Sequence, residues 1–234
     1  MNYTQQDRAM AVTTPLGADK LLLLSFTGQE AISRLFDFQL DLTAENEVDV
    51  AFDKLLGQKI TTRLDLPDDK KRYFSGICNR VSQGEQDEIF TRYRMEVVPQ
   101  FWLLTKRAQS RIFQQMTVPD ILKKVLTGLD VTYEIQGSFH PRDFCVQYRE
   151  TDFNFASRLM EEEGIFYFFK HNSDGHQMVV PGTCSKSTRR ARVMVQMPWS
   201  SDNPMPTATP CSIGSTMMAA AVATTSRNSP DDWR

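Results

Sequence analysis

Apolar and polar residues alternate along much of the first hundred positions. LFDFQLDL, residues 35–42, carries a large apolar side chain at every second position from Phe36 onward. The same period of two recurs in KITTRLDL, residues 59–66, and in IFTRYRMEVV, residues 89–98. Successive side chains of a strand point to opposite faces, so this period predicts strands with one buried face. In the third segment the predicted buried positions are Ile89, Thr91, Tyr93, Met95 and Val97.

Turn-forming residues separate these predicted strands. PDDK, residues 67–70, predicts a hairpin between residues 59–66 and 71–81. QGEQDE, residues 83–88, predicts a second turn. Gly76 interrupts a strand pattern and predicts a bulge or a tight bend. Short antiparallel strands joined by polar turns are typical of a β-barrel or a β-sandwich.

The pattern then changes to that of a helix. Thr117 is a favourable N-cap, Pro119 suits the first turn, and Gly128 is the expected C-cap. Between them, apolar residues recur at helical spacing and predict one buried face. These residues are Val118, Ile121, Leu122, Val125 and Leu126.

FCVQYRE, residues 144–150, returns to the alternation of a strand. Its apolar positions are Phe144, Val146 and Tyr148, which alternate with Cys145, Gln147 and Arg149.

A second helix is predicted to follow directly. Thr151 or Asp152 caps its start, and Gly164 can take the left-handed conformation that ends it. IFYFFK, residues 165–170, predicts an aromatic strand after the helix. The apolar helix face consists of Phe153, Ala156, Leu159 and Met160.

Three glutamates, Glu161, Glu162 and Glu163, fall on the last turn of this helix. Acids at a helix C-terminus oppose the macrodipole, and such a broken local rule can mark an interaction surface. The other interpretation is a solvated end whose acids pair with Arg158 or Lys170. A pair of catalytic carboxylates, as in a glycosidase, is disfavoured because neighbouring helical residues point in different directions.

Candidate chemistry is otherwise sparse. The histidines are His140, His171 and His176. A metal site built from the last two with Asp174 and Cys184 matches no strong zinc spacing. HNSDGH, residues 171–176, is better interpreted as a hairpin with Asp174 and Gly175 at its tip. No phosphate loop and no hydrolase motif occurs, so we expect no catalytic, cofactor-binding or metal-ligating residues.

Composition narrows the class of partner. The 234 residues are 41% hydrophobic with a net charge of −2, which gives no electrostatic reason to expect nucleic acid or an anionic membrane. No apolar run approaches the roughly 18 residues of a membrane span, and the polar N-terminus has no signal-peptide pattern. We therefore expect production in the cytoplasm. The cysteines are predicted to be buried or bystander thiols: Cys78, Cys145, Cys184 and Cys211.

Four longer phrases resemble one family, over about residues 15 to 180. They are RYFSGICNRV, YRMEVVPQFWLLT, SRIFQQMTVPDILKKVL and YRETDFNFASRLMEEEGIFYFF. In order and spacing they are similar to the N-terminal part of VgrG, the spike protein of the type VI secretion system. The resemblance implies an α+β, β-rich fold of small antiparallel β-barrels with inserted helices, like a phage baseplate hub. It also implies a ring of three chains on the hexamers of the inner tube, effectors carried on the spike, and no catalytic residues.

The expected function is therefore that of a structural hub fragment that scaffolds through self-association, without catalysis or cofactors. We expect a β-barrel-like hub domain over residues 1–108 and an α+β hub subdomain over residues 109–180. Residues 181–234 lack Leu, Phe, Tyr and Glu, which predicts a divergent, mostly disordered tail and raises the hypothesis of a truncated or frame-shifted copy. The tail also lies where the resemblance ends. Export through the type VI apparatus and the absence of membrane insertion are further expectations.

Two alternatives stay open at this stage. One is an effector or toxin enzyme delivered by the same machine, and the other is a truncated copy without function. A group of large apolar residues directly after a predicted strand offers either core packing or a subunit contact, with core packing favoured. These residues are Phe101, Trp102, Leu103 and Leu104.

Overall fold

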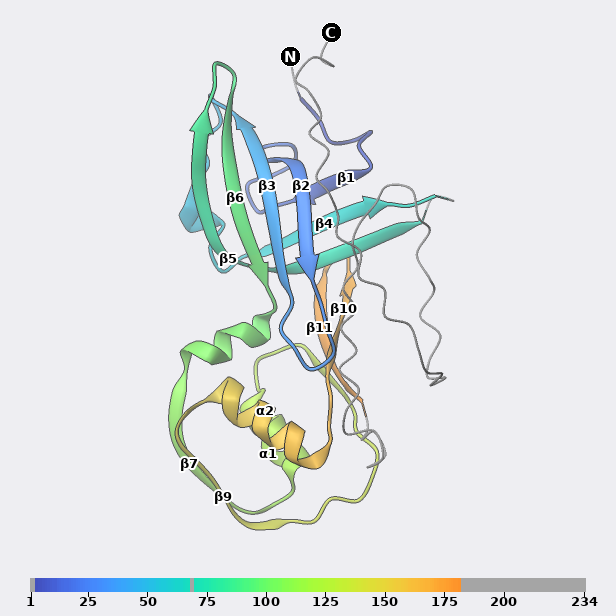
Figure 1. Ribbon diagram of the computed structural model, residues 1–234, viewed down its shortest axis with the longest axis vertical. Helices are drawn as coiled ribbons and strands as arrows, with labels where there is room; N and C mark the ends of the chain where they lie inside the picture. Colours follow the sequence, from blue (N-terminus) through green and yellow to red (C-terminus); the bar gives the residue numbers. More distant parts are fainter. Residues whose placement is uncertain (1–2, 68–69, 182–234) are drawn as a thin grey trace, which may run out of the picture. The chain divides into compact units, whose positions relative to one another are not determined.

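The computed structural model describes residues 3–67 and 70–181, drawn in colour in Figure 1. The predicted tail, residues 181–234, lies outside the described residues except for its first position. In chain order, the described elements are β1 (Met10–Thr13), β2 (Leu22–Gln29), β3 (Asp37–Glu45), the 3-10 helix η1 (Phe52–Lys54), β4 (Lys59–Asp65), β5 (Lys71–Gln86), β6 (Phe90–Val98), the 3-10 helix η2 (Gln100–Lys106), β7 (Ala108–Met116), α1 (Val118–Val125), β8 (Val131–Glu134), β9 (Arg142–Thr151), α2 (Asp152–Glu163), β10 (Phe168–Asn172) and β11 (Gly175–Pro181).

The largest sheet has six antiparallel strands in the order β1-β4-β5-β6-β3-β2 and curls into a half-barrel (Figure 1). Its inner face carries the alternating residues that the sequence predicted, and these side chains are buried. They include Phe38, Leu40 and Leu42 of β3, Ile60 and Leu64 of β4, and Tyr93, Met95 and Val97 of β6. The prediction is wrong for Ile89, which is exposed in the turn before β6.

The β4–β5 hairpin is confirmed, but the second turn is shorter than predicted. β5 continues through most of residues 83–88, because Gln83 pairs with Tyr93 and Gln86 with Thr91 across a bulge. The connection contains residues 87–89, where the Asp87 carboxylate accepts hydrogen bonds from the backbone N–H groups of Ile89 and Phe90, at 2.9 and 2.6 Å. Residues 83–86 are instead the exposed end of a strand, and only residues 87 and 88 of the predicted turn lie in the connection.

Gly76 occupies a close backbone approach rather than a bulge. It pairs in register with Ile60, and the two irregularities of β5 lie further on, between Cys78 and Arg80 and between Gln83 and Gln86. A Cβ at position 76 would lie 2.6 Å from Cγ1 of Val97 and 2.7 Å from the carbonyl oxygen of Val98. The predicted bulge at this residue is therefore wrong, and the glycine is required by packing.

Helix α1 begins as predicted, with the Thr117 side chain accepting a hydrogen bond from the N–H of Asp120. The helix ends earlier than predicted, with Leu126 as C-cap, and Gly128 takes its positive φ of 93° two residues later. The apolar stripe along α1 is buried. The helix is thus anchored through the face that its spacing indicated.

Helix α2 has both predicted ends. The Thr151 side chain caps its start by accepting from the N–H of Asn154, and Gly164 ends it with φ of 68°. The buried face differs in one position from the prediction, because Phe155 is fully buried and Phe153 only in part. Phe153 still packs against the Phe101 ring, at 5.0 Å between centroids.

Two smaller sheets complete the described fold. β7 and β9 form an antiparallel ribbon that runs alongside the helices, and β10, β11 and β8 form a three-stranded sheet in which β11 and β8 are parallel (Figure 1). The aromatic strand begins at Phe168 rather than at residue 165, because the N–H of Ile165 still bonds to the carbonyl of Met160 at the helix end. The β10–β11 hairpin is confirmed, although Gly175 pairs with Asn172 and the tip is Ser173 and Asp174.

Candidate interaction site

The acidic end of α2 is held by arginines. Arg142, at the start of β9, contacts Glu162 and Glu163, each at 2.6 Å, and Arg158 contacts Glu162 at 3.1 Å within the helix. The predicted pairing with Arg158 is confirmed. Arg142 was missed, because it lies twenty residues away in the sequence and reaches α2 only through the fold. Lys170 instead lies over the Phe168 ring.

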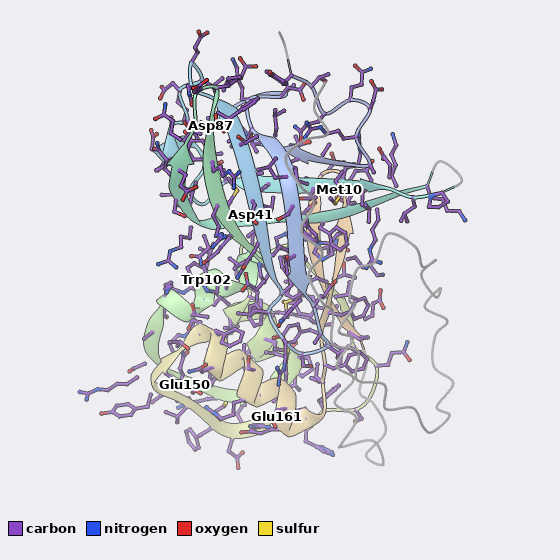
Figure 2. The ribbon with its side chains drawn as sticks, turned by 45° about the horizontal axis from the view of Figure 1, so that its top comes forward. Met10, Asp41, Asp87, Trp102, Glu150 and Glu161 are labelled. Atoms are coloured by element: carbon purple, nitrogen blue, oxygen red, sulfur yellow. The ribbon has the colours of Figure 1, made fainter. Side chains whose placement is uncertain are left out.

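This pairing favours the ionised form of Glu162. Partial burial raises the pKa of Glu162, but hydrogen bonds from Arg142 and Arg158 outweigh it and lower that pKa below its usual range. Glu161 is exposed at one end of α2, and Glu150 lies at the other (Figure 2). Glu162 is thus an ionised partner in ion pairs, which is the opposite of what a proton-donating catalytic carboxylate requires.

A second ionic cluster lies on the inner side of the β7–β9 ribbon. The carboxylate of Asp152 is fully buried and accepts hydrogen bonds from Arg107, from Arg111 at 2.5 Å and from Gln147 at 2.8 Å. The sequence placed Asp152 only as an alternative N-cap. Because Thr151 caps the helix, the Asp152 carboxylate is available for hydrogen bonds to Arg111 of β7 and Gln147 of β9. It thereby connects both strands to α2.

His171 and His176 face each other on β10 and β11 and are packed against Phe36. The backbone N–H of Gln100 donates to Nε2 of His176 at 2.9 Å, and that of Ser75 lies 3.1 Å from Nδ1 of His171. Burial, and then the neighbouring His171, lower the pKa of His176 to about 4. The two imidazole rings therefore pack at the junction between the β10–β11 hairpin and the half-barrel.

The remaining metal candidates are not brought together within residues 3–67 and 70–181, where no three His, Cys, Asp or Glu side chains converge as metal ligands. His140 is exposed in the segment before β9, and Cys184 lies outside the described residues. Cys78 and Cys145 are free, buried thiols, as predicted for them, and burial raises the pKa of Cys78 to about 11. Cys211 also lies outside the described part.

The apolar group after β6 is divided between core and surface. Phe101 and Leu104 of η2 are buried, which confirms core packing for these two. Trp102 is half-buried with the Lys106 ammonium 4.6 Å from its ring, and Leu103 is exposed. Leu103 alone thus keeps a large exposed apolar surface at this position.

The strand predicted over residues 144–150 is confirmed within β9, but its apolar side chains face outward. Phe144, Val146 and Tyr148 are 67%, 49% and 69% exposed, and Ile112 of β7, which pairs with Val146, is 64% exposed. The inward positions are Cys145 and Gln147. The outer face of this ribbon is the candidate interaction surface.

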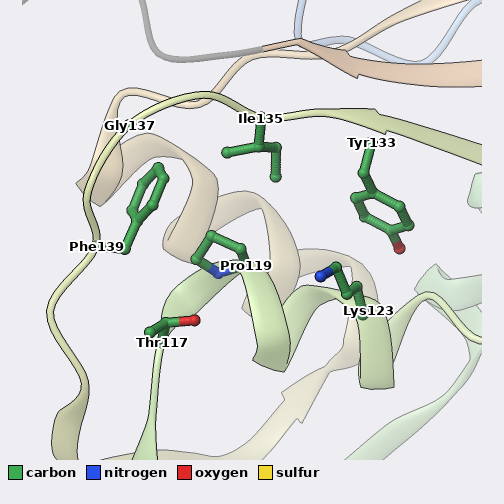
Figure 3. Close-up of a pocket in the computed structure, with 7 residues that line it drawn as sticks. All are labelled: Thr117, Pro119, Lys123, Tyr133, Ile135, Gly137 and Phe139. Carbon is green, nitrogen blue, oxygen red and sulfur yellow. The ribbon is translucent and has the colours of Figure 1, made fainter.

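A shallow pocket of about 320 Å³ lies between α1 and the segment that follows β8 (Figure 3). Burial raises the pKa of Tyr133 to about 12, so its phenol stays neutral. The lining includes no carboxylate, imidazole or thiol. The lining residues are Thr117, Pro119, Lys123, Tyr133, Ile135, Gly137 and Phe139.

Among the described helices, none has the length and apolar character to cross a bilayer. The described fold is a curled antiparallel sheet with inserted helices, held together by ionic clusters, and its β7–β9 ribbon has an exposed apolar face. These features are those of a β-rich structural protein of the hub type. The comparisons agree with this class. Residues 29–228 match the phage tail baseplate hub (GPD) family, and the chain belongs to that family. The match continues past residue 180, where the sequence resemblance ended.

Proteins similar in sequence include spike proteins of the type VI secretion system. The chain is 42% identical to the spike protein VgrG1b and 41% identical to VgrG1c of Pseudomonas aeruginosa, each over 183 residues. These matches cover 77% of this chain, which spans about a quarter of the length of these relatives (25%). The resemblance to VgrG is thereby confirmed.

A solved structure supports the fold class. The c3393 protein of E. coli, described as a component of the type VI secretion system with structural similarity to the T4 tail proteins gp27 and gp5, aligns with a TM-score of 0.62. The alignment has 24% identity and covers 74% of this chain and 48% of that one. The β-rich, baseplate hub-like α+β fold expected from the sequence is confirmed.

Proposed function

We propose that the chain acts as a structural hub of a type VI secretion spike and scaffolds it through self-association. The observation that carries this proposal is the membership of the hub family over residues 29–228, in a chain about 40% identical to VgrG spike proteins. The ion pairs of Glu162 and the packing of His171 and His176 support it, because these groups serve the architecture.

The proposed assembly has three copies in a ring that sits on the inner-tube hexamer and supports effectors. The near-neutral charge supports close approach between copies, since a net charge of −2 produces little repulsion. In this proposal residues 1–108 form the barrel part of the hub and residues 109–180 its helical part. β10 and β11 pack back onto β5, so the second part is tied to the first.

The proposal includes no catalysis and no cofactor. The chain is made in the cytoplasm and leaves the cell with the machine. The rival functions are a delivered enzyme and a copy without a role. They differ from the hub in what they bind, because neither requires recognition of the inner tube.

The test is co-purification of the full chain with the inner-tube protein of the same cell, followed by light scattering. We expect a complex that contains the tube hexamer and more than one copy of the chain. A chain that stays monomeric and does not bind the tube protein at any concentration would refute the proposal. The matched control is Asp152→Asn, which removes the buried carboxylate that joins the ribbon to α2 and should weaken capture only as far as it unfolds the chain.

A further inference from the structure

The six-stranded sheet ends in two edge strands, β1 and β2. Among the described strands, β1 pairs with β4 alone and β2 with β3 alone, so one side of each backbone has no strand partner. The curl of the sheet brings the two edge strands near each other (Figure 1). Unpaired edges present N–H and C=O groups that need other partners and that can pair with a strand of another chain. We call the gap between β1 and β2 the seam of the half-barrel.

The side-chain amide of Gln5 fills this seam and is almost fully buried, with 4% exposure. Its Oε1 accepts hydrogen bonds from the backbone N–H groups of Val12 in β1 and Leu23 in β2, at 3.0 and 3.1 Å. Its Nε2 donates to the carbonyl oxygens of Val12 and of Leu21, directly before β2, at 3.3 and 3.0 Å. A primary amide has two acceptor lone pairs and two N–H donors, so contacts to the two strands use its full capacity.

The arrangement requires an amide at position 5. A carboxamide carries the same donor and acceptor as a peptide group, so Gln5 supplies what the backbone of a further strand would supply. Glutamate has nearly the same shape, but its ionised form has no donor for the two carbonyl oxygens that face it. Methionine has a similar length and lacks both strong groups. Either substitution should leave buried backbone groups without partners, which is costly.

The segment that carries Gln5, residues 3–9, is held mainly by polar contacts. The Asp19 carboxylate accepts a hydrogen bond from the backbone N–H of Gln5 at 3.0 Å and lies 3.5 Å from its Nε2. The Arg8 guanidinium donates to the carbonyl oxygen of Leu23 at 3.4 Å. These contacts connect the segment to the loop before β2 and to β2 itself.

The same segment has little apolar anchorage. Gln5 is the only buried side chain within residues 3–9. Tyr3 is 36% exposed and meets the edge of the Phe90 ring, with 4.8 Å between centroids. Segments with few buried apolar contacts open at a lower free energy than core strands, which stay paired. Residues 3–9 are therefore a part of the half-barrel that can open by itself.

We propose that residues 3–9 form a strap that closes the seam, and that its release exposes the edges of β1 and β2 while the other strands stay paired. Gln5 is the positioning residue of the closed state, and Asp19 holds the strap in place. A closed strap covers two edges that otherwise offer a template to a strand of another chain. The strap does not depend on the hub function, because it concerns only groups within this chain.

The test is backbone amide hydrogen exchange of the full chain, measured by NMR at Val12 and Leu23. Gln5→Glu and Gln5→Met remove the amide, and the matched control Gln6→Glu makes the same amide-to-acid change at an exposed neighbour. We expect both amides to exchange at least tenfold faster in the two Gln5 variants and at the parental rate in Gln6→Glu. The amides of β6, which is paired on both sides, should keep their parental rates in all variants.

Asp19→Gly tests whether the strap acts as a unit. Asp19 contacts the strap rather than the two measured N–H groups, and glycine accepts its φ of 56° without strain. This variant should also accelerate exchange at Val12 and Leu23, and parental rates there would overturn the strap as a unit.

Unchanged near-UV spectra show that each variant is folded, and Gln5→Met carries the test if the buried charge of Gln5→Glu unfolds the chain. Parental exchange at Val12 and Leu23 in a folded Gln5 variant overturns the inference. Equal acceleration in β6 overturns it as well, because Gln5 would then stabilise the whole sheet rather than a seam that opens alone. Each of these outcomes leaves the proposed hub function intact.

Discussion

Acidification should loosen the junction between the β10–β11 hairpin and the half-barrel. Nε2 of His176 accepts a hydrogen bond from the backbone N–H of Gln100, so a protonated ring loses this bond. The facing ionisable groups are His171, whose ring is 6.3 Å away and whose own Nε2 lies 3.3 Å from Glu30, and Asp130. Burial is the main reason why the pKa of His176 is about 4, and His171 adds to it, while Asp130 opposes both.

The sign and size follow from linkage. The pKa of His176 is 6.5 when unfolded and about 4 when folded, so between these values the unfolded chain binds more protons. The free energy of unfolding must fall as the pH drops from about 6.5 to about 4, and this residue causes no further loss below that range. A difference of about 2.5 pKa units corresponds to about 3 kcal/mol. For a chain of this length that is a decrease of about 10 °C in melting temperature.

The assay is urea unfolding of the parent chain and of His176→Gln at several pH values across this window. Glutamine offers an oxygen acceptor to the Gln100 N–H but does not titrate, so we expect His176→Gln to lose about 3 kcal/mol less on acidification. His140→Gln, at an exposed position, serves as control and should follow the parent. Identical pH profiles for the parent and His176→Gln would refute the reasoning, since other groups would then account for the acid sensitivity.

Three further predictions concern α2. Gly164→Val should lower the melting temperature by the equivalent of about 1 kcal/mol or more, because φ of 68° penalises a β-branched residue, and an unchanged melt would contradict the left-handed helix end. Asp152→Asn should cost about 2–3 kcal/mol in urea unfolding, below the value for a fully buried pair because Arg107 and Arg111 are partly exposed; a loss under half of that would argue against the buried cluster. Glu162→Gln should keep the fold and cost about 0.5 kcal/mol, since its ion pairs are screened by solvent. Abolition of a hydrolytic activity by this change would contradict the structural role of the glutamates.

Local signals predicted every helix cap except Gly128, and most of the strands, correctly. Thr117, Thr151 and Gly164 act through hydrogen bonds or backbone angles within a few residues, so their neighbours in sequence decide their roles. The buried face of β6 was predictable for the same reason, because alternation is a local property. The wrong prediction that Gly128 is the C-cap of α1 also has a local cause. A residue with a positive φ can lie two residues beyond the C-cap, in the turn that leaves the helix.

Partners distant in sequence explain most of what the sequence could not supply. The need for glycine at position 76 comes from Val97 and Val98 on the neighbouring strand. The pairing of Glu162 with Arg142 requires β9 to lie beside α2. Alternation in β9 predicted two faces, but which face turns inward depends on the hydrogen bonds of Asp152 in α2, whose partners are Arg107 before β7, Arg111 of β7 and Gln147 of β9.

The ion pairs of Glu162 and Glu163 and the orientation of the β7–β9 ribbon are linked through helix α2. Arg142 at one end of β9 is held by the acids of α2, and Gln147 near its other end is held by Asp152 at the start of the same helix. Polar contacts at both ends of α2 therefore hold the β7–β9 ribbon against the helix, and the apolar side chains on its outer face take no part in them. A buried ionic cluster contributes less stability than well-packed apolar residues of similar size. With such a cluster inside and Phe144 and Tyr148 outside, the fold gives up some of its own stability and leaves large apolar side chains exposed on the ribbon.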